Sequence, residues 1–262
     1  MNKNQICNLG DLLEILVDPE SKESLTFNGN TLYNSKNSFN LIQESPILFP
    51  SPISKYLNNF VIDMTNKDQF TSIEQYFKIL SIKMYMEINN LDANDYWYKQ
   101  HLSWSKELVS TSQGLLLDIG CDDLEINLKV FPDNKIKYVG LEPIIKKKNY
   151  FSIYGVAEFL PFQSNSFDCV SFLTSLDHVL DYYSALKEAK RVLKKEGTLY
   201  LATLVWNKKS ELYNDHHHFH HFKEFEIFGA LNELDFNIEK LDRYAWKNDE
   251  NRTALYIKAE KK

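Results

Sequence analysis

The sequence predicts an α/β fold whose larger part is a doubly wound, mainly parallel sheet. An apolar run of strand length at residues 115–119 breaks at Gly120, and a second apolar run ends in the acid Glu142, which is the pattern of strand, turn and second strand. After Glu142, strand-like and helix-like segments alternate to the end of the sequence. This alternation is typical of parallel sheets with helical crossovers.

The turn at Gly120 and the carboxylate of Glu142 are expected to lie side by side. Parallel strands bring their carboxyl ends to one edge of the sheet, where folds of this kind bind ligands. A carboxylate there can accept hydrogen bonds from both ribose hydroxyls of a nucleoside. The sequence therefore predicts a nucleoside site, and a solvated acid at a strand end is the alternative for Glu142.

The later elements are predicted from their own patterns. Continuous apolar residues predict a buried strand at 167–173. One apolar face predicts a helix at 181–195, with Gly197 as its C-terminal stop. The remaining predicted elements are strands at 151–156 and 198–205, a helix at 222–234, and strands at 236–241 and 252–258. We expect the last strand to be antiparallel.

Residues 1–53 are predicted to form a separate, small β-rich domain. A short helix at 12–17 precedes a hairpin whose Asn28-Gly29 pair is typical of a type I′ turn. Two further short strands are predicted at 39–42 and 47–49. A domain of this size needs a metal, disulfides or a neighbouring domain for stability.

Residues 54–112 are predicted to be a helical lid or linker region. Apolar residues at spacings of three and four predict an amphipathic helix at 68–89. An aromatic-rich stretch at 95–104 follows, which either packs in the core or covers the ligand site as a lid. Residues 113–262 then form the ligand-binding sheet domain.

Composition and charge exclude several classes of protein. The 262 residues carry 30 basic and 36 acidic side chains, a net charge of −6, which argues against a nucleic-acid partner because phosphate binding needs a clustered positive face. The cysteines Cys7, Cys121 and Cys169 are scattered and odd in number, as expected of reduced thiols. No apolar run reaches membrane-spanning length, and the polar start is unlike a signal peptide. We expect a cytoplasmic protein.

Five short motifs occur in a consistent order, at residues 117–121, 140–142, 155–162, 165–170 and 189–199. Together they resemble the class I S-adenosylmethionine-dependent methyltransferases, and more narrowly the type 11-like group that acts on small molecules. The resemblance covers roughly residues 110–262. It implies a Rossmann-like sheet of seven strands with the last one antiparallel, S-adenosyl-L-methionine as cofactor, and transferase activity.

The resemblance assigns a set of residues to the cofactor, namely Asp118, Gly120, Cys121, Glu142, Ala157, Glu158 and Thr174. The first three would approach the methionine part of the cofactor. Glu142 would accept the ribose hydroxyls, and the pair at 157–158 would border the adenine. Thr174 would lie beside the methionine moiety and the methyl group.

Two departures from the family pattern bear on activity. The family turn usually carries three glycines that permit close backbone approach, but Asp122 and Leu124 occupy the second and third positions. The acid that often precedes the adenine-bordering alanine is replaced by Val156. Asp122 also adds negative charge near the cofactor's own carboxylate. A catalytically inactive protein therefore stays an open alternative.

The candidate catalytic residues follow the 167–173 strand and a later histidine run. Asp177 and His178 would face the substrate, where His178 could take a proton from an acceptor hydroxyl; the alternative is a histidine that only stabilises the loop. The run at 215–222 holds five of the seven histidines, and we expect His217 and His220 to line the substrate. Histidines four residues apart on a helix are compatible with a divalent metal, which is not expected, and incidental surface histidines are the third alternative.

The order of pieces in residues 1–53 resembles the small zinc-ribbon domain of the Trm112 type. The resemblance places the metal positions at Asp18, Ser21, Leu32 and Ser35, none of which is cysteine. Because a structural zinc site needs about four thiolate or imidazole ligands, we expect no zinc and a domain docked against the larger one. An unrelated β-rich domain is the alternative.

The sequence thus predicts a methyltransferase for a small-molecule acceptor, with O-methylation of a sugar or of a glycolipid or polysaccharide precursor as the expected reaction. An RNA methyltransferase and an inactive scaffold protein are the alternatives. The sequence names neither the acceptor nor the oligomeric state.

Overall fold

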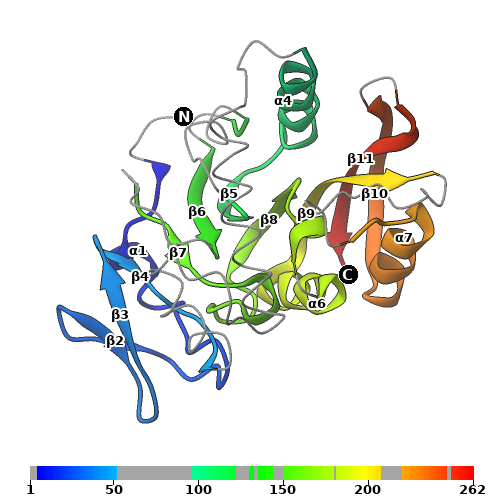
Figure 1. The fold of residues 1–262 in the computed structure, drawn as a ribbon. Coiled ribbons are helices and arrows are strands. Elements are labelled where there is room, and N and C mark those ends of the chain that lie inside the picture. The colour runs from blue at the N-terminus through cyan, green and yellow to red at the C-terminus, as the bar shows by residue number, and fades with distance from the viewer. Residues whose placement is uncertain are drawn as a thin grey trace, which may run out of the picture.

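The computed structural model describes residues 5–51, 96–121, 130–132, 135–143, 150–179, 181–207, 220–246 and 249–262. A seven-stranded sheet in the order β10-β11-β9-β8-β5-β6-β7 forms its centre (Figure 1). The strands are β5 (Gly114–Ile119), β6 (Ile136–Glu142), β7 (Ile153–Tyr154), β8 (Phe167–Leu173), β9 (Leu193–Trp206), β10 (Phe236–Trp246) and β11 (Asp249–Lys261). Strands β5 to β9 are parallel and β11 is antiparallel to both of its neighbours, so the predicted fold class is confirmed.

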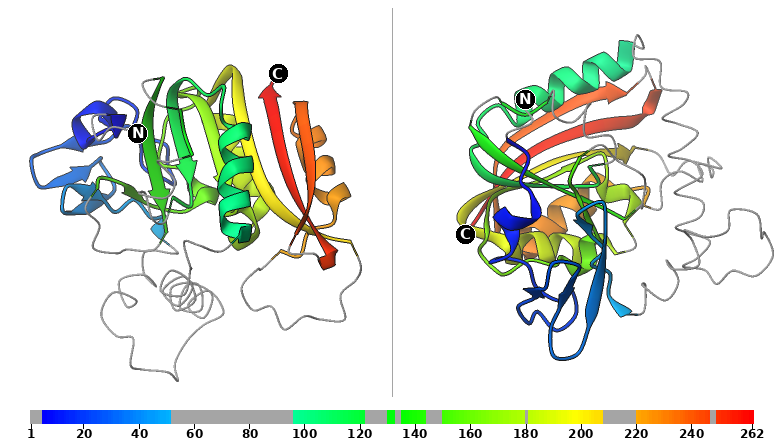
Figure 2. Two further views of the ribbon diagram at one scale, coloured as in Figure 1. Left: turned by 90° about the horizontal axis from the view of Figure 1, so that it is seen from above. Right: turned by 90° about the vertical axis from the view of Figure 1, so that its left-hand side faces the viewer.

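Helices cover both faces of this sheet. Helix α4 (Tyr96–Leu108) lies on one face, and α6 (Tyr182–Val192) and α7 (Glu224–Glu233) lie on the other (Figures 1 and 2). Each face has its own core. The α4 core includes Tyr138 and Tyr256, and Trp104 of α4 stacks on Tyr244 of β10 with ring centroids 4.1 Å apart. Among the described residues, no helix is long and apolar enough to cross a bilayer.

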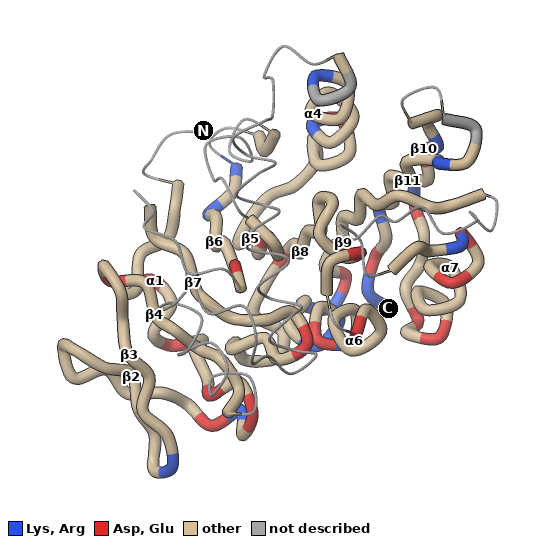
Figure 3. Tube along the Cα trace, in the orientation of Figure 1, with Lys and Arg blue, Asp and Glu red and all other residues tan. Residues whose placement is uncertain are grey.

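Charged residues of both signs occur on α6 and on the β10–β11 pair, whereas the charged residues of α7 are acidic (Figure 3). Several of the basic side chains there are paired with acids on neighbouring elements, as shown by Lys190–Asp235, Lys240–Glu107, Arg243–Glu224 and Lys258–Glu239. Such exposed pairs each contribute little to stability. They do give this part of the surface a mixed charge.

A small four-stranded antiparallel sheet precedes the main sheet, as predicted. The N-terminal module, residues 5–51, contains α1 (Leu9–Leu12), β1 (Thr26–Phe27), β2 (Thr31–Tyr33), β3 (Ser38–Ile42) and β4 (Ser45–Pro46). It packs along the β6–β7 edge of the main sheet (Figure 2). The amide of Cys7 donates to the Tyr138 carbonyl (2.9 Å), and that of Leu48 donates to the Tyr154 carbonyl (2.7 Å).

The predicted helix at 12–17 is wrong in position. Helix α1 starts earlier because Asn8 and Asp11 form a reciprocal capping box at its N-terminus. Leu16, placed in the predicted helix, instead forms a bridge with Phe162 of the main domain. Pairing with another domain thus outweighs local helical propensity here.

The hairpin between β1 and β2 is present, but its turn differs from the predicted type I′. Of the central residues Gly29 and Asn30, only Gly29 has a positive φ angle, at 98°. A positive φ at the first central position alone is the pattern of a type II′ turn. The Asn28 side chain accepts hydrogen bonds from the amides of Asn30 and Thr31, which shifts the turn by one residue.

The predicted helix at 181–195 ends three residues early, at Val192. Strand β9 begins at Leu193 because this residue pairs with Phe167 of β8, and the amide of Ser166 donates to the Val192 carbonyl (2.8 Å). Gly197 therefore lies within a strand. The last two strands extend beyond the predicted ranges because they pair with each other along most of their length.

Two smaller differences remain, and one predicted helix is not tested. Strand β7 is limited to two residues of the predicted 151–156. A strand was predicted at 47–49, but strand β4 lies just before that range. Within the range, Ile47 forms an isolated bridge with Tyr154. The predicted helix at 68–89 lies outside the described residues.

Asp18, at the first predicted metal position, is a hydrogen-bonded centre of the N-terminal module. One carboxylate oxygen accepts from the amides of Glu20 (2.9 Å) and Ser21 (3.0 Å), and the other from the side chains of Asn34 (3.1 Å) and Asn37 (2.6 Å). Burial alone would raise the pKa of Asp18, but these hydrogen bonds lower it overall. The carboxylate thus joins two loops of the module.

Candidate active site

The Gly120 turn is attached to β6 directly beside Glu142. Strands β5 and β6 pair in register from Gly114 to Ile119. Just beyond, the amides of Gly120 (2.8 Å) and Cys121 (3.3 Å) both donate to the Leu141 carbonyl. Glu142 follows and is 1% exposed. The predicted juxtaposition of turn and acid is therefore present in the structure.

Only glycine fits at position 120. Its φ angle is +79°, and a Cβ built on it would lie 2.4 Å from the Cβ of Ser175, closer than side-chain atoms approach. Ser175 follows β8 and donates a hydrogen bond from Oγ to the Ile119 carbonyl. This hydrogen bond joins the end of β5 to the chain that follows β8. Asp122 and Leu124 lie outside the described residues.

The carboxylate of Asp118 is buried and fixed from two sides. The Tyr138 hydroxyl donates to one oxygen (2.5 Å) and the Ser171 hydroxyl to the other (2.7 Å). Burial and the adjacent Asp118 charge raise the pKa of Tyr138 well above its usual value, so the phenol keeps its proton and remains a donor. Neither partner was predicted from the sequence, although Ser171 interrupts an apolar strand.

Cys121 is buried at the end of the same turn. A Cβ at Gly140 would lie 2.6 Å from the Cys121 sulfur. The glycine of the second motif therefore makes room for the cysteine of the first, which couples β5 to β6 at their carboxyl ends.

The 3₁₀ helix η2 (Ala157–Phe159) lies after β7 and contains the predicted adenine-bordering pair. The amide of Gly155 donates to the Glu142 carbonyl (3.1 Å), which brings this segment next to the acid. Ala157 is buried. The Glu158 carboxylate accepts from the amide of Asp181 (3.1 Å), the N-cap of α6.

Thr174 ends β8 in a strained conformation. Its φ angle is +63°, which is rare for a β-branched residue. Strain of this kind often marks a functional site. Thr174 is exposed, and its amide donates to the Ala202 carbonyl (2.8 Å).

The 3₁₀ helix η3 (Leu176–His178) carries the two predicted catalytic residues. Asp177 is buried and His178 is half-buried. The His178 Nε2 lies 3.9 Å from an Asp177 carboxylate oxygen. This distance suits a charge-stabilised pair once the imidazole is protonated.

His220 lies against the same loop but contacts its backbone. Its amide donates to the Asp177 carbonyl (3.1 Å), and its Nε2 lies 2.8 Å from the Val179 carbonyl. Because a carbonyl only accepts, Nε2 carries the proton. The ring stacks on Phe222 at a centroid distance of 5.3 Å. The structure thus brings His220 and His178 together around one loop.

The rest of the histidine run is only partly described. His217 lies outside the described residues, and His221 packs edge-on against Trp206. Within the described ranges, no group of three or more His, Cys, Asp or Glu side chains could hold a metal ion.

Part of this chain is similar in sequence to known proteins. Residues 117–201 match a family of methyltransferase domains. Over 150 residues the chain is 30% identical to the demethylmenaquinone methyltransferase of Staphylococcus epidermidis, covering 50% of this chain and 60% of that protein. The chain therefore spans less than two thirds of that relative's length.

Solved structures share the fold at low sequence identity. The [4+2]-cyclase SpnF has a TM-score of 0.56 at 16% identity, covering 71% of this chain and 94% of SpnF. A 1,6-didemethyltoxoflavin-N1-methyltransferase from Burkholderia thailandensis, with bound S-adenosylhomocysteine, has a TM-score of 0.50 at 13% identity, covering 89% of this chain and 99% of that one. At such identities the likeness concerns the fold alone.

Residues 117–201 of the sheet domain thus match a methyltransferase domain, and the sheet around them has a fold found in solved methyltransferase structures.

Proposed function

We propose that the protein is an S-adenosylmethionine-dependent methyltransferase that acts on a small molecule. The observation that carries the proposal is the Gly120 turn held on β6 beside the buried Glu142. A turn that only glycine can form allows backbone to approach a ligand closely. A buried acid next to it suits a ribose diol.

The residues present fit this cofactor. Glu142 would accept the ribose hydroxyls, Ala157 and Glu158 would border the adenine, and Asp118 would supply negative charge toward the amino group of the methionine part. Gly120, which has no Cβ, lets the turn at the end of β5 pack against Ser175. When bound, S-adenosylmethionine supplies an electrophilic methyl group.

The acceptor is proposed to be a hydroxyl of a sugar, or of a glycolipid or polysaccharide precursor. The His178 imidazole would take the hydroxyl proton as the oxygen bonds to the methyl carbon, while the bond from that carbon to sulfur breaks and S-adenosylhomocysteine leaves. The buried Asp177 carboxylate, 3.9 Å away, would stabilise the resulting imidazolium. Thr174 and Ser175 would keep this loop beside the reacting groups.

A demethylated quinone is the second candidate acceptor. It is favoured by the similarity of half of this chain to a demethylmenaquinone methyltransferase. A panel of hydroxylated sugars, glycolipid precursors and demethylated quinones, each incubated with radiolabelled S-adenosylmethionine, separates the two candidates.

Calorimetric titration with S-adenosylmethionine and S-adenosylhomocysteine tests the proposal itself. We expect saturable binding of both. Absence of binding at millimolar ligand would overturn the enzyme and favour a scaffold protein, whereas tight, salt-sensitive RNA binding would favour an RNA methyltransferase.

A further inference from the structure

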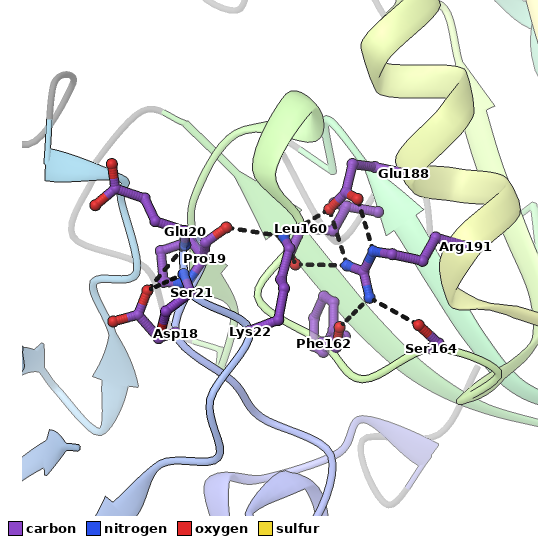
Figure 4. Close-up of polar contacts among 10 residues, drawn as sticks. All are labelled: Asp18, Pro19, Glu20, Ser21, Lys22, Leu160, Phe162, Ser164, Glu188 and Arg191. Carbon is purple, nitrogen blue, oxygen red and sulfur yellow. Dashed lines mark hydrogen bonds and ion pairs between the residues drawn. The ribbon is translucent and has the colours of Figure 1, made fainter. Parts of the chain in front are cut away.

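Lys22 of the N-terminal module reaches across to the methyltransferase domain. Its ammonium group donates to the Glu188 carboxylate of α6 (2.8 Å), to the Leu160 carbonyl (3.1 Å) and to the carbonyl of its own neighbour Pro19 (2.8 Å) (Figure 4). The three acceptors use the three donors of an ammonium group. Lys22 therefore joins the module, α6 and the chain just after η2.

Arg191 of α6 holds the same stretch of chain from the other side. Its guanidinium donates to the Leu160 carbonyl (2.9 Å) and the Phe162 carbonyl (2.7 Å), and it pairs with Glu188 (Figure 4). Two cations thus converge on one carbonyl, with Glu188 between them. The Lys22 and Glu188 side chains are 32% and 14% exposed, so water competes for this network less than for a surface pair.

Backbone hydrogen bonds extend the contact. The amide of Val17 donates to the Pro161 carbonyl (3.0 Å), and the amide of Gln163 donates to the Ile15 carbonyl (2.8 Å). At the other end, the amide of Leu48 donates to the Tyr154 carbonyl. The module therefore holds residues 154–163, here called the adenine-border segment, at both ends.

We propose that the N-terminal module positions the cofactor site, with Lys22 as the positioning residue that fixes the adenine-border segment through the Leu160 carbonyl. The inference rests on the proposed function, because Ala157 and Glu158 in the middle of this segment border the adenine in that proposal. Lys22 itself touches no reacting group. A site fixed in advance binds its ligand more tightly because less ordering remains to be done on binding.

The test compares Lys22→Met with Lys36→Met in the full chain. Methionine keeps an unbranched side chain at a position whose φ angle is +58°, so backbone strain is unchanged. Lys36 belongs to the same module but pairs with Glu23 at the surface, where the two side chains are 61% and 41% exposed. Lys36→Met therefore removes a lysine without touching the methyltransferase domain.

We expect Lys22→Met to weaken S-adenosylhomocysteine binding about fivefold, the order of a modest coupling between sites, and Lys36→Met to leave it unchanged. Hydrogen exchange, measured without ligand, should become faster in residues 154–163 of Lys22→Met only. Glu188→Gln, which changes the network from the α6 side, should have the same two effects. If Lys22→Met fails to fold, the results for Glu188→Gln decide whether the inference holds.

Each outcome has one meaning. Failure of the unsubstituted protein to bind S-adenosylhomocysteine overturns the proposed function and this inference together. Normal binding in the unsubstituted protein, with unchanged affinity and exchange in the folded variants, overturns the inference alone. Equal effects of Lys22→Met and Lys36→Met would show a general loss of module stability and would also overturn it.

Discussion

The two flanks of the proposed cofactor site are held by different means. The glycine turn, residues 118–121, is fixed by contacts inside the sheet, from Leu141, Tyr138, Ser171 and Ser175. The adenine-border segment shares hydrogen bonds with residues 15–48 of the N-terminal module and accepts further ones from α6. These contacts on the glycine turn come from its own domain, although one of the contacting residues, Tyr138, also accepts a hydrogen bond from Cys7 of the module. The second flank is contacted by the module directly.

The largest effect is expected from breaking the glycine turn with Gly120→Ala. Alanine at a φ angle of +79°, with its Cβ against Ser175, should lower the free energy of unfolding by about 2–4 kcal/mol. We expect S-adenosylhomocysteine binding to fall more than tenfold, as calorimetry would measure (about 1.4 kcal/mol per factor of ten).

Gly229→Ala is the matched control for that change. Gly229 lies in helix α7, and a Cβ added there would meet no neighbouring atom within 4 Å, so alanine should leave binding unchanged and stabilise the helix slightly. Hydrogen exchange of residues 154–163 should stay normal in Gly120→Ala. Faster exchange there would mean that the two flanks are not held independently.

Glu142 lies between the two flanks. We expect Glu142→Ala to weaken adenosine binding by about tenfold, because the charge-assisted hydrogen bonds to the ribose are lost. The affinity of 2′,3′-dideoxyadenosine should change little, because it lacks both hydroxyls. Glu142→Gln keeps the shape of the side chain, and its affinity for adenosine should lie between those of the unsubstituted protein and of Glu142→Ala. Equal losses for both nucleosides would place the ribose elsewhere.

His220 holds the end of the loop that carries Asp177 and His178, because its Nε2 donates a hydrogen bond to the Val179 carbonyl. His220→Phe keeps the ring stacked on Phe222 but loses that hydrogen bond, and we expect kcat to fall by about threefold to tenfold with cofactor affinity unchanged. His220→Gln, which retains an N–H donor, should recover part of the rate. Losses of about a hundredfold or more in both variants would instead identify His220 as the general base.

The smallest effect concerns neither flank. His101 of α4 lies 2.6 Å from the Tyr256 hydroxyl, and burial lowers its pKa from 6.5 to about 4. Between these values the unfolded chain binds more protons than the folded one, so stability should fall as pH drops through this window, by roughly 1 kcal/mol per pH unit. Denaturant titrations at several pH values measure the stability of the unsubstituted protein and of His101→Gln. The stability of the variant should no longer fall in this pH window. An identical pH dependence in both would show that other groups cause it.

The main sheet could be predicted from the sequence because its strands are apolar, are bounded by glycine, and follow one another in order. The side-by-side position of Gly120 and Glu142 followed from the geometry of parallel strands alone. Element ends were less predictable. Leu193 left its predicted helix because a partner, Phe167, lies 26 residues earlier in the chain.

The contacts between the domains could not be read from the sequence. Lys22 and Glu188 are separated by 166 residues, and nothing in either local pattern distinguishes them from ordinary surface charges. Asp18 stood at a predicted metal position, yet its partners Asn34 and Asn37 were visible only as loop residues. Such polar networks depend on where backbone carbonyls and amides meet after folding.

The two outer edges of the main sheet are protected in different ways. Strand β10 ends the sheet on one side and carries alternating charges at Glu239, Lys240, Asp242 and Arg243, which discourage pairing with another chain. The β6–β7 edge is instead covered by residues 6–7 and 47–48 of the module. Cutting the module away would bare carbonyls and apolar side chains on that side only. We therefore expect the isolated sheet domain to self-associate through a single edge, so the module also protects against aggregation.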